Sequence, residues 1–239
     1  MTSGRTLING RPLRYRVRRH PRARRRVVRV SREAGVVVTL LRSDRLTVAQ
    51  EMLQKCSAWV EERAEKAGVW DGPVVRSFTT GSRILLHGQP RTLELTLLPA
   101  GRRRSRMLQE EGILRLELTP QELLSPREPL IRLLKAEGGR FLRRRVAHWE
   151  DITDLHPAKV VVGERRTRWG SCSSRGTLSL CYRLVMAPTA VADAIVVHEL
   201  CHLRHMDHSD RFYALLESFL PDYRETEDWL RVHYTDMMI

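Results

Sequence analysis

The sequence predicts an α+β protein, with a mainly antiparallel β-region carrying one helix at residues 1–120 and a helix-rich domain with a small β-sheet at 121–239. Apolar and polar residues alternate in the first part, most clearly at 93–97 and 114–118, as in half-buried strands. After residue 120 the apolar spacing becomes helical, and a helix-start signal follows at once. The change in spacing therefore places a domain boundary near residue 121.

Strands are expected first, at residues 6–40. Apolar residues alternate with arginines at 13–17, and two valine-rich runs flank a turn at 33–35, which indicates antiparallel hairpins. One helix is expected at 47–68, because it begins with the Thr-x-x-Gln spacing of a capping box and ends near a glycine. Further strands are expected at 78–119. No internal repeat is evident.

A long helix is expected at residues 126–149. Ser125 is its cap, proline occupies its first position, and Glu128 completes the capping box. Gly138 and Gly139 lie within this helix and indicate either a kink or a close approach of another backbone.

Strands and shorter helices are expected in the remainder of the chain. Two strands at 159–162 and 177–184, joined by a Gly- and Ser-rich loop, precede a helix that begins near Thr189. Two more helices follow, the first capped by Ser209 and ending at Pro221.

The helix that begins near Thr189 carries the most informative motif of the chain. His198, Glu199 and His202 have the spacing H-E-x-x-H, and helical residues four apart lie about 40° apart around the axis and about 6 Å along it. Two imidazoles so placed can hold zinc, with the glutamate acting as general base on metal-bound water. The helix is apolar on nearly all sides, and buried histidines and a buried carboxylate need partners such as a metal.

His208 is the expected third ligand, because a catalytic zinc usually has three protein ligands and keeps one position for water. An unbroken helix would place His208 about 15 Å from His198 along the axis and about 80° off its face. The helix must therefore end soon after His202 and the chain must fold back. His205 is a rival ligand, although it lies only three residues after His202.

Composition favours a globular protein of the cytoplasm. The 239 residues, 42% of them hydrophobic, suffice for a proper core. No apolar run approaches the length of a membrane span, and the N-terminus leads into no signal-peptide segment, so no membrane partner is expected. The four cysteines form no C-x-x-C pair, which suits a reducing compartment. These cysteines are Cys56, Cys172, Cys181 and Cys201.

The formal net charge of +14 has two explanations. All but four of the 42 basic residues are arginine, a bias that genome base composition can produce without functional demand. The excess also favours an anionic partner, nucleic acid or another polyanion, on a basic surface. The arginines gather in four segments, at 22–26, 102–106, 143–145 and 165–168.

Three segments together resemble the YgjP-like metallopeptidase family. They are residues 168–173, residues 196–202, and His208-Ser209 with the Phe212 and Pro-Asp-Tyr that follow. The N-terminal half, with its Arg-rich strands, is also similar. The resemblance implies a small zincin-like domain of the minigluzincin type with zinc as its cofactor. It assigns metal binding and catalysis to four residues: His198, His202 and His208 as ligands, and Glu199 as the catalytic residue.

Three functions stay open at this point. The resemblance implies hydrolysis of a peptide bond, and the strand at 177–183 is expected to pair with an extended peptide as edge strands do. An alternative is a nucleoside triphosphate pyrophosphohydrolase that uses the same metal water and an arginine clamp. The third is a basic nucleic-acid-binding protein with a structural zinc, against which Glu199 argues, since a structural zinc needs no general base. The candidate substrate-binding residues are Arg168, Ser171 and Arg175, with Arg165 and Arg166 as further members of the clamp.

Overall fold

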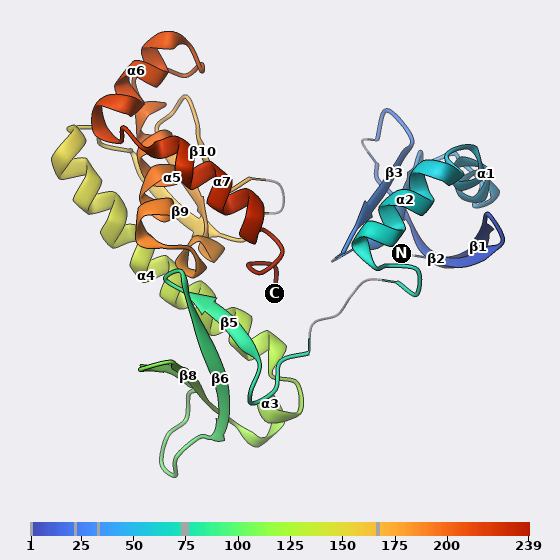
Figure 1. Ribbon diagram of the computed structural model, residues 1–239, viewed down its shortest axis with the longest axis horizontal. Helices are drawn as coiled ribbons and strands as arrows, with labels where there is room; N and C mark the ends of the chain where they lie inside the picture. The colour runs from blue at the N-terminus through green and yellow to red at the C-terminus, as the bar shows by residue number, and fades with distance from the viewer. Residues whose placement is uncertain (1, 22, 33, 73–76, 166–167) are drawn as a thin grey trace. The chain divides into compact units, whose positions relative to one another are not determined.

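The computed structural model describes residues 2–21, 23–32, 34–72, 77–165 and 168–239. The chain is α+β and divides into two compact units, Met1–Arg76 and Ser77–Ile239 (Figure 1). The division thus precedes the second set of strands, whereas the sequence predicted it near residue 121. The physical reason is long-range packing: Leu116 from these strands shares one core with Leu130 and Leu184 of the later elements.

The first unit packs two helices against one face of a four-stranded sheet. Its strands have the order β1-β2-β4-β3, and the β1–β2 and β3–β4 pairs are antiparallel, while β2 and β4 run parallel. The elements are β1 (Thr2–Ile8), β2 (Arg11–Arg19), β3 (Val27–Ser31), β4 (Gly35–Leu40), α1 (Thr47–Lys55) and α2 (Ser57–Ala67).

The structure has two helices, α1 and α2, where the sequence predicted one helix at 47–68. The chain leaves the helical conformation at Cys56, which has φ −117° and ψ 32°. Its amide still donates to the carbonyl of Met52, and its own carbonyl accepts from Val60, so the two helices follow each other without a loop. Leu53 of α1 and Val60 of α2 then lie in the same core as Tyr15 of β2.

The second unit begins with a sheet of the same topology as the first. Its strands are β5 (Arg83–Leu86), β6 (Gln89–Leu97), β7 (Arg106–Glu110) and β8 (Ile113–Leu118), in the order β5-β6-β8-β7. Again the outer pairs are antiparallel and the central pair, β6 with β8, is parallel. In Figure 1 each sheet is followed along the chain by helices, α1 and α2 in one unit and α3 (Pro120–Leu124) and α4 (Arg127–Thr153) in the other.

The matching sheets reveal an internal repeat that the sequence analysis missed. RTLINGRP at residues 5–12 corresponds to RILLHGQP at residues 83–90. In both copies the strands are joined by a two-residue turn with positive φ at each residue, 49° and 82° at Asn9-Gly10 and 51° and 76° at His87-Gly88. Such type I′ turns match the twist of a hairpin and favour Asn and Gly. The repeat therefore consists of a hairpin, a second hairpin and a helical segment.

The rest of the second unit combines α4 with a three-stranded sheet and a C-terminal set of helices. The sheet has the order β10-β11-β9, with β10 antiparallel and β9 parallel to β11. The elements are β9 (Lys159–Gly163), β10 (Gly170–Cys172), β11 (Thr177–Cys181), the 3-10 helix η1 (Tyr182–Met186), α5 (Thr189–Cys201), α6 (Asp210–Phe219) and α7 (Tyr223–His233).

The position of β11 corrects one expectation. The strand predicted at 177–183 lies between β10 and β9, so both of its edges are paired and it cannot accept a peptide as an edge strand. The edge strands are β9 and β10, and β10 lies inside the segment that was expected to be a loop. It was missed because it has only three residues, Gly-Ser-Cys, of low strand propensity.

The glycines of α4 mark a close approach, one of the two alternatives predicted for them. A Cβ at Gly138 would lie 2.5 Å from the backbone oxygen of Tyr182, so only glycine lets η1 pack this closely on the helix. Farther along α4, Arg145 donates two hydrogen bonds, of 2.6 and 2.7 Å, to the carboxylate of Asp193 in α5. These contacts fix α4 against η1 and α5.

Among the described residues, no helix is both long and apolar enough to cross a membrane.

Candidate metal centre

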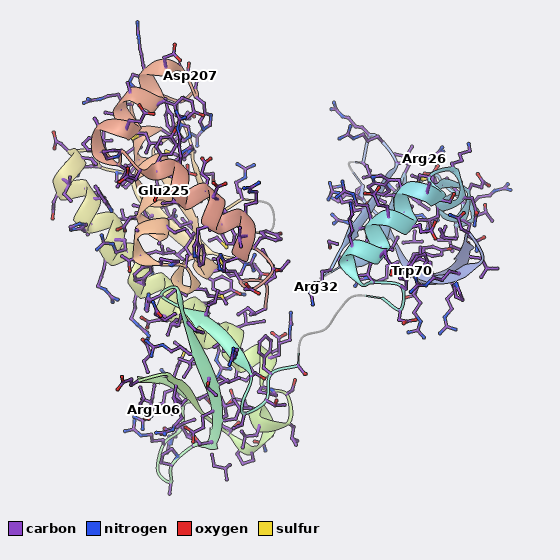
Figure 2. The ribbon with its side chains drawn as sticks, viewed as in Figure 1. Arg26, Arg32, Trp70, Arg106, Asp207 and Glu225 are labelled. Atoms are coloured by element: carbon purple, nitrogen blue, oxygen red, sulfur yellow. The ribbon has the colours of Figure 1, made fainter. Side chains whose placement is uncertain are left out.

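Three histidines from two segments converge at the C-terminal end of α5. The helix ends at Cys201 with His202 as its cap, and the chain folds back before α6 begins at Asp210. Asp207, labelled in Figure 2, marks this turn. The fold-back brings Nε2 of His208 to 3.1 Å from Nε2 of His198. Nitrogen atoms of His198, His202 and His208 all lie within 4.8 Å of one another.

This spacing fits a bound metal ion. Two imidazole nitrogens that each lie about 2.0–2.1 Å from a tetrahedral zinc are roughly 3.4 Å apart, close to the 3.1 Å between the nitrogens of His198 and His208. Within the part of the chain that the structure describes, these three histidines are the group of His, Cys, Asp and Glu side chains whose ligand atoms gather in this way. The residues present therefore fit the zinc that the H-E-x-x-H spacing predicts.

Phe212 of α6 forms the floor of the histidine cluster. Its ring is fully buried and stacks on His202 with centroids 4.6 Å apart. His198 and His208 each contact it with centroids 4.9 Å away. One aromatic ring thus limits the movement of all three imidazoles. In the sequence, Phe212 was part of the motif on which the resemblance rested, but no role in the site was predicted for it; its position four residues after His208 was the available signal.

His205, the rival ligand, contributes its backbone instead of its ring. The Nδ1 of His202 lies 3.0 Å from the carbonyl oxygen of His205. With Nδ1–H as donor, the lone pair is on Nε2, and the hydrogen bond fixes the orientation of the ring as second-layer partners of metal-binding histidines do. The His205 ring is not part of the described cluster.

The local electrostatics favour the neutral forms of His198 and His202. Burial, together with the charges of His202 and His208, lowers the pKa of His198 to about 4. Burial is also the main cause that lowers the pKa of His202, opposed by the carbonyl of His205. Metal binding requires neutral imidazole, so a depressed pKa removes the competition with protons at neutral pH.

Glu199 is buried between α5 and β10. Burial raises its pKa to about 7, while the charge of Arg168 and a backbone hydrogen bond from Cys172 act in the opposite direction. A general base works best with a pKa near the operating pH, and an acid with a raised pKa in a site is a typical functional group. The short strand β10 is therefore part of the site, because it provides the hydrogen bond to this carboxylate.

Gly170 makes room for the carboxylate. A Cβ at this position would lie 2.5 Å from Oε1 and 2.6 Å from Cγ of Glu199, too close for any real contact. Gly170 was part of the motif on which the resemblance rested, but its role could not be read from the sequence because it depends on a contact with a residue 29 positions later.

We expect Gly170→Ala to lower hydrolysis by roughly tenfold or more without loss of metal binding, because the added methyl group must push Glu199 off its position and small misplacements cost much in rate. The measurement is turnover together with metal content. The control is Gly163→Ala on β9, where the nearest atom to an added Cβ lies 3.7 Å away. Equal turnover of the Gly170 variant and the wild type would contradict this role.

The candidate substrate residues are not all near the cluster. Arg168 is exposed, and its charge acts on Glu199. Ser171 lies in β10 opposite Ser179 of β11. Arg175 is exposed in the turn between these strands, and no hydrogen bond or ion pair among the described residues joins it to the site. Of the expected arginine clamp, Arg166 lies outside the described residues.

Arg165 is held by a buried arginine of η1. Nη2 of Arg183 donates to the carbonyl of Arg165 over 2.5 Å, and the side chain of Arg183 is 6% exposed. The side chain of Arg165 itself donates to the carbonyl of Glu164. Arg183 therefore fixes the backbone of the segment before Arg168, which is a structural task that the sequence analysis did not assign to it.

Comparison with known proteins gives one family and one structure. The family model described as YgjP-like, metallopeptidase domain, matches residues 24–233. A similar solved structure is the crystal structure of the metallopeptidase zymogen of Pyrococcus abyssi abylysin, with 23% sequence identity and a TM-score of 0.35. That likeness covers 39% of this chain and 93% of the other. No curated protein matches the chain.

Proposed function

The chain belongs to the YgjP-like metallopeptidase family, and on this premise we propose that it is a zinc-dependent peptidase whose general base is Glu199. As a member of that family the chain is a metal-dependent hydrolase; the identity of the metal, its ligands and the substrate are what we propose. The observation that carries the proposal is the convergence of His198, His202 and His208 next to a buried carboxylate with a raised pKa.

The residues of the chain have distinct tasks in this proposal. His198, His202 and His208 would hold the ion, which when bound would supply Lewis acidity and lower the pKa of a water molecule to about 7. Glu199 is the group that takes a proton from the attacking water molecule, and it can return that proton to the leaving nitrogen. Phe212 and the carbonyl of His205 keep the imidazoles in position.

The edge of β10 supports a peptide as substrate. On its other side β10 pairs with β11, and its backbone donates to Glu199. An extended peptide that adds to the free edge of a sheet is held by main-chain hydrogen bonds whatever its sequence. A peptide bound along β10 would pass beside the carboxylate. Ser171, in the middle of this strand, pairs through its main chain with Ser179 of β11, so the main-chain groups that face the free edge belong to Gly170 and Cys172.

A nucleoside triphosphate has weaker support as the substrate. A phosphate clamp needs several guanidinium groups that converge on one point. Among the described residues, the charge of Arg168 acts on Glu199, while the side chains of Arg165 and Arg183 donate to the backbone carbonyls of Glu164 and Arg165. Nucleoside triphosphates are therefore assayed as the alternative substrates in the test of the proposed function.

The cysteines support a location in the cytoplasm. All four are free thiols in the structure, two of them buried. An oxidising compartment favours disulfides in secreted domains, whereas free thiols persist where glutathione and thioredoxin keep them reduced. We therefore keep the cytoplasm as the proposed location.

The proposed function is tested with the zinc-loaded full-length protein on a quenched-fluorescence peptide library and, in parallel, on a panel of nucleoside triphosphates. We expect peptide cleavage that a chelator abolishes and added zinc restores. Release of pyrophosphate from nucleotides without cleavage of any peptide would overturn the peptidase proposal and favour the alternative. Activity that survives complete removal of the metal would exclude both.

A further inference from the structure

The positive charge of the protein is concentrated in the first unit. Residues 1–76 contain 18 arginine and lysine residues against seven Asp and Glu, a formal charge of +11. Residues 77–239 contain 24 against 21, a formal charge of +3. Genome base composition acts on a whole gene, so by itself it does not explain why one third of the chain carries most of the excess.

Within the first unit the charge lies on one face of the sheet. Side chains alternate between the two faces of a strand. Leu13, Tyr15 and Val17 of β2 point into the core with the helices, which leaves the intervening arginines on the opposite face, here called the outer face. The strand pairing sets Arg5 opposite Arg14 and Arg29 opposite Val37. The arginines of the outer face are Arg5, Arg14, Arg16, Arg18 and Arg29.

No carboxylate balances these arginines on the strands. The ranges of β1, β2, β3 and β4 contain no Asp or Glu at all. Arg5, Arg14 and Arg29 are exposed, and within the described ranges of the chain no ion pair involves them. Like charges on neighbouring positions of a sheet are destabilising. Repulsion among these arginines therefore lowers the stability of the first unit, and a surface with only a structural role would avoid that loss.

The repeat provides an internal comparison. In the second sheet the position of Arg16 is taken by Glu94, and that of Val37 by Arg115, since each pair has the same register. There Arg115 forms ion pairs with Glu94 at 2.8 Å and with Glu110 at 2.6 Å. A third ion pair joins Arg106, which is labelled in Figure 2, and Glu117. The same fold in the same chain thus balances its charges in one copy and leaves them unbalanced in the other.

Three of these arginines border a hollow at one end of the sheet. Arg5, Arg14 and Arg16 line a hollow of about 440 Å³ together with Tyr15 and with Asp71 of the segment that follows α2. Arg16 is held in place because its guanidinium donates to the carbonyl of Ala34. Its Nε is buried and has no partner among the described residues. A guanidinium fixed in this way can present its remaining donors to a phosphate with little loss of entropy.

We propose that the outer face of the β1-β2-β4-β3 sheet binds single-stranded nucleic acid through its phosphates. Arginine forks match phosphate groups, and arginines at alternate positions of a strand are spaced by roughly 7 Å. Broad sheet faces lie against single strands, whereas duplex grooves admit a helix or a two-stranded ribbon. Among the described residues, Leu7 is the one large apolar side chain that is exposed on this face, and a single such side chain inserts little into a bilayer, which disfavours a lipid surface. Binding of this kind depends on charge and not on base sequence.

The test measures binding of the full-length protein to a fluorescein-labelled 20-nucleotide oligo-dT by anisotropy over a series of salt concentrations. Each phosphate contact to a single strand contributes about 0.7 to the slope of log K against log salt. The double variant Arg14→Ala with Arg29→Ala is expected to lower this slope by about 1.4. The matched control is Arg45→Ala with Arg63→Ala, which removes the same charge from exposed positions outside the sheet and leaves the slope unchanged.

Any one of several outcomes would overturn the proposal. They are absence of binding at low salt, equal losses in the two double variants, binding to a duplex as tight and as dependent on Arg14 and Arg29, and binding to phosphatidylserine vesicles in place of the oligonucleotide. Melting curves of both double variants show whether the fold is kept. The proposal is independent of the metal site, so chelation is expected to leave the affinity unchanged, and its loss on chelation would also count against the outer face.

Discussion

Glu199→Gln is expected to abolish hydrolysis while the protein keeps its metal and its fold. Glutamine has nearly the shape of glutamate and can still accept the backbone hydrogen bond from Cys172 through its amide oxygen. It cannot accept a proton from water. Removal of a general base costs about a hundredfold to ten-thousandfold in rate. Stability is expected to change little, since the buried carboxylate, whose pKa burial raises to about 7, is replaced by a neutral group of equal size.

The measurement is the rate on the best substrate, metal content and the melting temperature, each compared with the wild type. Glu225→Gln on α7 is the matched control, because it makes the same chemical change at an exposed position. The control is expected to have wild-type turnover. A Glu199 variant that holds its metal and still turns over at the wild-type rate would show that the proposed mechanism is wrong.

Loss of any one of the three histidines is expected to weaken zinc binding by more than about a hundredfold, since partners outside the ligand shell already cost ten- to a hundredfold. The variants are His198→Ala, His202→Ala and His208→Ala. His205→Ala is the matched control, because His205 offers its carbonyl to His202 and alanine keeps that carbonyl. Competition with a chromophoric chelator gives the affinities, and metal analysis gives the stoichiometry, expected at about one ion per chain.

These four variants separate the two candidates for the third ligand. If His205→Ala lost the metal while His208→Ala kept it, the third ligand would be His205 and the 3.1 Å approach of His208 to His198 would need another explanation. Melting temperatures with and without zinc add a second readout, because an ion that binds only the folded protein raises its stability.

The metal-site geometry was predictable because it depends on short spacings. Residues four apart on a helix must share a face, and the ten residues from His198 to His208 require a fold-back, which the structure has between α5 and α6. The α+β class followed from alternation and helix caps. These signals are local, so a single sequence carries them.

The remaining features depend on contacts between distant residues. The boundary was placed near residue 121 because strands give way to helices there, whereas the core joins Leu116 to Leu184 across that point. The order of the strands could not be predicted from the sequence either, because the apolar–polar alternation of β11 is the same whether it is an edge strand or a central strand. The repeat was overlooked because half of the eight positions in RTLINGRP and RILLHGQP differ.

The three histidines differ in how far they are open to water. His202 is 8% exposed, His198 is half-buried, and His208 lies on the exposed turn before α6. Under the proposed ligation, His208 is the ligand that can detach without disturbing the core, while the other two stay fixed on a buried helix. Exchange of the ion with the medium is therefore expected to proceed by departure of His208 first. The residence time of the metal is then governed by the surface turn at 203–209 and not by the stability of the helix.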